Sequence, residues 1–181
     1  MPRLRPIDPD SATGLTKEML GQIRDEMGMV PNLFLTMAHS PAVLEGFVAL
    51  RNAVENSMLT PKLREEIALA VSEANASEYC ICGHTAMGKR LGLTDEQMIE
   101  ARRGHSSDSK EEAALSFAEA LLDRQGAITD DDLIRVREAG YGDREIAEIV
   151  ACVALYMFGD YFSQATQTEL DFPRVPALAE I

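Results

Sequence analysis

Apolar residues recur at helical spacing along most of the sequence, and no stretch alternates between apolar and polar residues with a period of two. Several segments open with a helix-start signal, as at Ser40-Pro41 and Thr60-Pro61, and several end at a glycine. A sheet requires strands, and no strand pattern is present. The sequence therefore predicts an all-α fold of eight or nine helices. The expected helices cover residues 16–28, 33–38, 41–57, 61–75, 78–91, 94–104, 110–125, 129–139 and 143–169.

The length of 181 residues predicts one domain, 1–181, because this is enough chain to bury a substantial core. Residues 1–14 hold three prolines and are expected to form an irregular N-terminal arm. The chemistry-bearing residues concentrate in 64–91, which we treat as the core motif.

Charge and composition restrict the partners. The net charge of −13 argues against nucleic acid or an anionic membrane, because phosphates attract a basic face. Every apolar stretch is interrupted within a few residues, so we expect no membrane span. The start, MPRLRPIDPD, lacks the apolar core of a secretory signal, and three cysteines do not suit a secreted disulfide scaffold. The expected location is the cytoplasm.

The stretch from Arg64 to Leu91 holds two of the three cysteines and one of the three histidines. Its two helical halves are separated by Asn75-Ala76-Ser77, so we expect an antiparallel pair of helices. Ser77 is a good N-cap residue and places Cys80 in the first turn, where unpaired N–H groups and the helix dipole favour the thiolate. His84 follows Cys80 by four residues and therefore lies on the same face. The pattern predicts Cys80 and His84 as a reactive pair.

The other two cysteines are expected to stand apart from this pair. Cys82 points roughly 200° around the helix axis from Cys80, and an i,i+2 pair on a helix is badly placed for a disulfide. Cys152 lies within an apolar run and is predicted to pack in the core.

A metal site is the alternative interpretation of the same motif. On a strand, Cys80, Cys82 and His84 would converge as ligands of the kind that zinc prefers. The helical pattern and the lack of a fourth ligand nearby argue against it, so we expect no metal. His39 and His105 lie in loop or helix-end contexts and are given no role.

The core motif resembles that of the alkylhydroperoxidase/carboxymuconolactone decarboxylase superfamily, the AhpD-like proteins. That motif is a glutamate, then Cys-x-x-Cys, then a histidine four residues after the second cysteine. Glu65, Cys80 and His84 match its glutamate, second cysteine and histidine, with Tyr79 between the cysteine positions. Ser77 stands where the family has the first cysteine.

The resemblance extends beyond the core motif, from GMVPNLF at 28–34 to LDFP at 170–173, a pattern similar to the uncharacterised peroxidase-related branch of the superfamily. It implies an AhpD-like helical bundle and supplies the functional interpretation of Glu65. Glu66 is the alternative carboxylate if the alignment slips by one residue.

The resemblance implies a cysteine-based oxidoreductase that reduces peroxides, of the alkylhydroperoxidase type. The Cys80 thiolate would become a sulfenic acid, with His84 and Glu65 as the proton relay. Because Ser77 replaces the first cysteine of the family motif, Cys80 has no second thiol beside it. An external thiol, or Cys82 after local unwinding, would therefore resolve the sulfenic acid. No Gly-rich phosphate loop or haem-attachment motif is present, so no organic cofactor is expected.

Two other functions fit the same residues. A cofactor-free acid–base enzyme of the carboxymuconolactone decarboxylase type would use His84 and Glu65 on a carboxylate substrate, with Lys89 or Arg90 as the basic group. A non-catalytic helical oligomer would use none of them.

Self-association is expected in every case. Four large apolar residues gather on the final helix, and so large an exposed patch is unusual on a monomer. Two-fold pairing is the commonest way to bury such a patch. We therefore expect at least a homodimer, with the final helix near the contact and the Cys80 pocket close to it. The four residues are Met157, Phe158, Tyr161 and Phe162.

Overall fold

The computed structural model describes residues 1–180, which form nine α-helices, two short 3₁₀ helices and no strand. The all-α prediction is confirmed. The helices are α1 (Gly14–Met27), α2 (Asn32–Met37), α3 (Pro41–Glu55), α4 (Pro61–Ala74), α5 (Glu78–Arg90), α6 (Asp95–Arg102), α7 (Ser109–Asp123), α8 (Asp130–Glu138) and α9 (Asp143–Thr166), with η1 (Pro9–Ser11) and η2 (Leu178–Glu180) as the 3₁₀ helices.

The helix boundaries follow from local signals. The side chains of Ser40, Thr60 and Thr94 each accept the backbone N–H three residues on, and each precedes a helix. The largest difference from expectation is at the end of α9, which stops at Thr166. Gln167 adopts a left-handed conformation with φ of 50°, which terminates the helix there.

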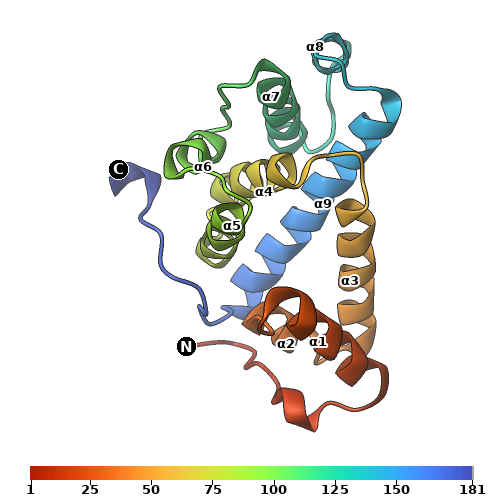
Figure 1. Ribbon diagram of the computed structural model, residues 1–181, viewed down its shortest axis with the longest axis vertical. Helices are drawn as coiled ribbons and strands as arrows, with labels where there is room; N and C mark the ends of the chain where they lie inside the picture. Colours follow the sequence, from red (N-terminus) through yellow and green to blue (C-terminus); the bar gives the residue numbers. More distant parts are fainter. Residues whose placement is uncertain (181) are drawn as a thin grey trace.

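The long helix α9 crosses the molecule, with α4 and α5 on one side and α3 on the other (Figure 1). Helix α4 packs against α5, α6, α7 and α9, and it is therefore buried on nearly every side. Its Ile67, Leu69 and Val71 have no exposed surface. Since the core motif begins on α4, it lies at the centre of the fold.

The sequence was expected to contain no segment long and apolar enough to span a membrane, but α9 meets both criteria. Within residues 1–180 it is the one helix long and apolar enough by length and composition. A core helix passes the same test, and here α9 packs against α3, α4, α5 and α7. It also carries a fully buried aspartate, Asp160, which side chains of the neighbouring α4–α5 segment hydrogen-bond.

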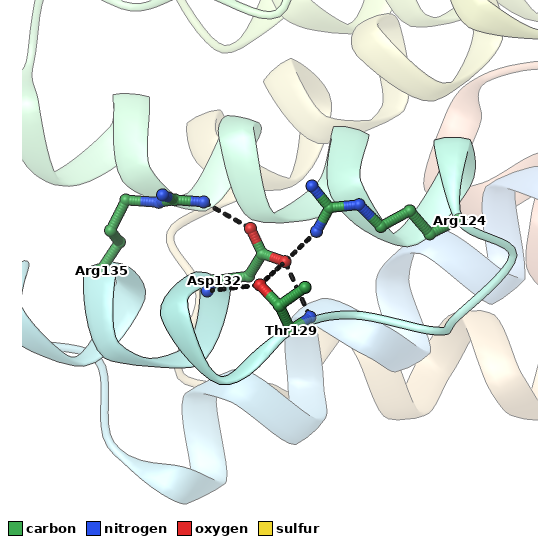
Figure 2. A network of polar contacts seen from close by, with 4 residues as sticks. All are labelled: Arg124, Thr129, Asp132 and Arg135. Atoms are coloured by element: carbon green, nitrogen blue, oxygen red, sulfur yellow. Dashed lines mark hydrogen bonds and ion pairs between the residues drawn. The ribbon is translucent and has the colours of Figure 1, made fainter.

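Helix α8 is anchored by a polar cap (Figure 2). The Asp132 carboxylate accepts the backbone N–H of Thr129 at 2.8 Å and its hydroxyl at 2.7 Å. Arg124 and Arg135 form ion pairs with the same carboxylate. The pKa of Asp132 is lowered to about 2, and the hydrogen bonds from Thr129 are the largest cause. This network is a capping box of a kind that fixes a helix start.

The two outer motifs of the sequence meet in space. The backbone N–H of Asn32, at the start of α2, donates to Asp171 Oδ2 at 2.5 Å, and the Asn32 side-chain amide donates to the Glu169 carbonyl at 3.0 Å. A carboxylate at a helix N-terminus is favoured by the unpaired N–H groups there. The pairing ties the C-terminal segment to α2 and brings it across α5.

Candidate active site

Helices α4 and α5 place the Glu65 and His84 side chains against each other. The chain reverses through 75–77, where Ala76 has a φ of 52°. The two helices then pack together along their length. His84 Nδ1 lies 2.8 Å from Glu65 Oε2. Both side chains are largely buried, with 21% and 15% exposure, so the pair is shielded from bulk solvent while remaining reachable.

The environment of His84 makes it a stronger base than an ordinary histidine. Burial alone would lower its pKa, but the charge of Glu65 and the hydrogen bond to it outweigh burial and raise the pKa. The more distant charge of Asp160 adds to this. The His84 ring also packs edge-on against Tyr156, with centroids 4.8 Å apart. With Nδ1 donating to Glu65, Nε2 is the nitrogen left to exchange protons with another group.

A cavity of about 240 Å³ opens beside this pair. Glu65, Cys80 and His84 all line it. Most of the remaining wall is apolar, which fits a small organic molecule rather than a fully hydrated ion. The aromatic side chains of the wall are Phe34, Phe47, Tyr79, Tyr156 and Phe172.

Cys80 lies in the first turn of α5 as expected, but the expected thiolate is wrong for this conformation. The thiol is buried, and burial raises its pKa, with the negative charge of Asp160 adding to the effect. Hydrogen bonds from Ser77 and Ser163 act in the opposite direction and are outweighed. Desolvation therefore raises the pKa of Cys80 by more than the helix dipole can lower it, because a thiolate is unfavourable where water is excluded.

Cys80 and His84 share the cavity without touching directly. The Cys80 sulfur lies 3.7 Å from the Ser163 hydroxyl of α9. Among the contacts of residues 1–180 there is no hydrogen bond between Cys80 and His84. A proton passing between them would therefore need a water or a substrate atom in the cavity.

Ser77 occupies the N-cap position of α5, but its predicted capping bond is absent. The side chain is fully buried and turns toward α9 instead, where its hydroxyl lies 3.1 Å from that of Ser163. The prediction that Ser77 caps α5 through its side chain is therefore wrong. Its hydroxyl has a hydrogen-bond partner in Ser163 and makes no bond to the backbone of α5. Ser77, Cys80 and Ser163 thus form one small polar cluster.

Asp160 and Ser163 are the site residues that the sequence analysis missed. Asp160 has no exposed surface and accepts hydrogen bonds from Ser72 and Asn75, each at 2.9 Å. No arginine, lysine or histidine pairs with it in the described part of the chain. The sequence did carry a signal for Asp160, because an aspartate within an otherwise apolar run indicates a buried polar group.

Three other candidate residues lie away from the cavity. Glu66 is buried on another face of α4, near Glu111, so Glu65 and not Glu66 lines the cavity. The Cys82 thiol is buried against the backbone of Val175. Cys152 is fully buried in the core, as predicted.

The basic residues of the cavity are not the expected ones. Lys89 forms an ion pair with Asp95, and Arg90 donates to the Met27 carbonyl at 3.1 Å. Neither lines the cavity.

Two arginines line the cavity wall instead. Arg51 is held by Glu26 and Glu55 at 3.0 and 2.7 Å. Arg64 donates to the Leu59 carbonyl at 2.8 Å. Within residues 1–180 no cluster of three or more His, Cys, Asp or Glu side chains could hold a metal ion.

Similarity to known proteins is found in both the sequence and the fold. The model of the carboxymuconolactone decarboxylase family matches residues 41–123, which contain Glu65, Cys80 and His84. A search among curated proteins gave no match.

Several solved structures share the fold. An uncharacterized peroxidase-related protein from Silicibacter sp. TM1040 superposes with a TM-score of 0.79 at 25% identity over 91% of each chain. An uncharacterized peroxidase-related protein from Ralstonia eutropha JMP134, described as an AhpD core, gives 0.86 at 23% identity over 94% of this chain and 92% of its own. The debrominase Bmp8 gives 0.80 at 20% identity over 93% and 91%.

Fold and site thus define an all-α protein with a Glu–Cys–His cavity. The part of the chain that holds the site is similar to the carboxymuconolactone decarboxylase family, and the fold is similar to that of the peroxidase-related proteins.

Proposed function

We propose that the protein is a cofactor-free oxidoreductase that reduces peroxides through Cys80. The observation that carries the proposal is the 2.8 Å contact between Glu65 and His84 in the cavity that Cys80 also lines. A thiol, a base and a carboxylate that orients the base are the parts that an activated cysteine nucleophile requires.

The first step is substitution at a peroxide oxygen. Neutral His84 takes the thiol proton through a water or a substrate atom, and Cys80 sulfur attacks one oxygen of ROOH. The S–O bond forms as the O–O bond breaks, giving a sulfenic acid and ROH. The alkoxide leaving group recovers the proton from His84, so atoms and charge balance. Because the resting thiol is protonated, the thiolate forms only when substrate occupies the cavity.

One external thiol then condenses with the sulfenic acid, releasing water and forming a mixed disulfide. A second external thiol attacks the mixed disulfide, which frees the Cys80 thiol and leaves the two external thiols joined as a disulfide. Ser77 cannot resolve the sulfenic acid, since a hydroxyl forms no disulfide, and the Cys82 thiol is turned away under Val175. Such a cycle depends on a reducing compartment, so we place the protein in the cytoplasm.

A second candidate function is proton transfer without thiol chemistry, as in a decarboxylase-like enzyme. The observation that favours it is the burial that raises the pKa of Cys80. His84 and Glu65 would serve unchanged as general base and orienting carboxylate, and Arg64 would be the basic group facing an acidic substrate.

Thiol-dependent consumption of cumene hydroperoxide tests the first proposal. We expect activity in the parent and in Cys82→Ser, and none in Cys80→Ser. Mass spectrometry of the parent after dilute peroxide should show one added oxygen on Cys80. If the Cys80→Ser variant still consumes peroxide, or the parent thiol stays unmodified, thiol peroxidase chemistry is refuted.

The pH profile tests the relay. The rate should rise with pH as His84 loses its proton, with a midpoint above that of an ordinary histidine, because Glu65 raises its pKa. Glu65→Gln removes the charge while keeping the shape, so the midpoint should move to lower pH. An unmoved midpoint would contradict the assignment of His84 as the base.

A further inference from the structure

Helix α9 carries a glycine, Gly159, in its interior and beside the reactive thiol. Glycine is unfavourable within a helix, because it loses more backbone freedom on folding than any other residue. A glycine at such a position therefore calls for a reason in the backbone, in the packing or in the function. Gly159 is buried and lines the same cavity as Cys80.

Neither the backbone nor close packing requires this glycine. Gly159 does not have the positive φ that favours glycine. A Cβ at this position would lie 3.8 Å from the Phe47 ring and 3.9 Å from the Cys80 sulfur, which are ordinary van der Waals distances. A Cβ at Gly88, by contrast, would lie only 3.0 Å from the Met98 sulfur. Packing therefore requires glycine at 88, whereas alanine would fit at 159.

The absent side chain leaves free a space that borders both the Cys80 sulfur and the Phe47 ring. Only 5% of Cys80 is exposed, so a substrate must reach its sulfur through the cavity. The buried Ser163 hydroxyl covers another side of the sulfur at 3.7 Å. The Phe47 ring packs edge-on against Phe34 and Phe158, with centroids 5.7 and 5.4 Å apart, so neighbouring rings hold it in place.

The size of the cavity indicates what this space can hold. Attack on a peroxide is an in-line substitution, so the leaving oxygen and its substituent extend away from the sulfur and need room on either side of that line. The cavity has a volume of about 240 Å³. An apolar protein cavity of about 150 Å³ holds benzene. A peroxide with a substituent as large as a phenyl ring therefore fits, as long as the space beside the sulfur stays empty.

We propose that Gly159 is a specificity-determining residue, which admits hydroperoxides with a bulky apolar substituent by leaving the space beside the Cys80 sulfur unfilled. The inference rests on the proposed peroxidase function and concerns the substrates of that same site. A methyl group at 159 would take the room that the substituent needs. Hydrogen peroxide has no substituent and would be affected less.

The preference between two peroxides tests the role of Gly159. In Gly159→Ala, the ratio of kcat/KM for cumene hydroperoxide to kcat/KM for hydrogen peroxide should fall about tenfold, the lower end of what one methyl group decides in an apolar pocket. Gly21→Ala, within α1 where a Cβ has no neighbour inside 4 Å, is the matched control and should keep the parental ratio. An unchanged ratio in Gly159→Ala would overturn the inference.

Thermal unfolding separates this role from a structural one. Both replacements put a better helix former into a helix interior, so neither should lower the melting temperature. A fall in melting temperature for Gly159→Ala alone would show that its backbone or packing needs glycine, which contradicts the inference.

A second measurement does not depend on peroxidase activity. Methyl methanethiosulfonate and benzyl methanethiosulfonate transfer a small and a bulky thioalkyl group to a thiol and release the same methanesulfinate. Mass spectrometry follows their addition to Cys80. The ratio of the benzyl rate to the methyl rate should fall about tenfold in Gly159→Ala and stay parental in Gly21→Ala.

These reagents also distinguish the two proposals. If the parent consumes no peroxide but the benzyl-to-methyl ratio falls in Gly159→Ala, the peroxidase function is refuted and the control of access by Gly159 is supported. An unchanged benzyl-to-methyl ratio would refute the control of access, whether or not the parent consumes peroxide.

A compensating change tests where the added methyl group acts. Phe47→Leu removes the ring atoms Cε2 and Cζ, which lie nearest to a Cβ at Gly159. Combined with Gly159→Ala, it should restore most of the benzyl-to-methyl ratio. Phe172→Leu makes the same change elsewhere in the cavity wall and should restore nothing. Equal recovery from both leucine variants, or recovery from neither, would contradict the assigned space between the sulfur and Phe47.

Discussion

Replacing the buried Glu66 by glutamine should remove a pH dependence of folding stability. Burial raises the pKa of this carboxyl from 4.5 to about 7, and the charge of Glu111 adds to the effect while Lys62 opposes it. Only 2% of the residue is exposed, and its Oε2 has no hydrogen-bond partner in the described chain. The folded state therefore favours the protonated carboxyl, whereas the unfolded chain loses this proton above about pH 4.5.

The sign and size follow from proton linkage. The folded state holds a proton that the unfolded state releases above about pH 4.5, so stability falls as the pH rises. A tenfold difference in proton affinity corresponds to about 1.4 kcal/mol, so the loss between pH 4.5 and 7 totals about 3 kcal/mol. Glu66→Gln stays neutral throughout and should lack this loss.

Urea unfolding between pH 5 and 8, at one protein concentration, measures the effect. The parent should lose about 2 kcal/mol or more relative to Glu66→Gln over that range, given its pKa of about 7. The quantity compared is the change in unfolding free energy with pH, not its absolute value. The absolute values differ for another reason, since the buried amide of the variant also needs hydrogen-bond partners. Glu18→Gln, at an exposed position on α1, is the control and should keep the parental slope. Equal slopes in parent and Glu66→Gln would refute the reasoning.

Three further outcomes are expected. Asp160→Asn removes the charge that helps to raise the pKa of Cys80, so iodoacetamide should alkylate that thiol faster than in the parent; an unchanged rate would contradict the electrostatic assignment. Ser77→Cys should give an internal disulfide with Cys80 under mild oxidant, detected as a loss of two mass units, whereas two free thiols would argue against dithiol geometry here. Asp132→Asn should lower the melting temperature at neutral pH and change it little near pH 2, because the favourable ionised form is lost as the pH falls through the depressed pKa.

Local patterns were enough to predict the helices. Start signals such as Thr60-Pro61 act within one turn of chain, and the periodicity of apolar residues identifies each buried face. The end of α9 was missed because a left-handed Gln167 has no strong sequence signal.

The site was predictable only in part. Cys80 and His84 share a face because both lie on α5, and family resemblance selected Glu65. The pKa of Cys80 was misjudged because the helix dipole is local, whereas burial and the charge of Asp160 come from packing between α9 and the α4–α5 turn. The hydroxyl pair of Ser77 and Ser163 depends on the same long-range packing.

The attachment of the C-terminal segment to α2 has a consequence for the timing of folding. Phe172 closes part of the cavity wall, packing edge-on against Tyr79 at 5.8 Å, and its neighbour Asp171 is held by Asn32. The ribosome adds these residues long after the helices that carry Glu65, Cys80 and His84. A nascent chain would therefore expose an unfinished site, and its thiol would be most open to oxidation during synthesis. Trapping stalled chains with a thiol-alkylating reagent would show when that vulnerability ends.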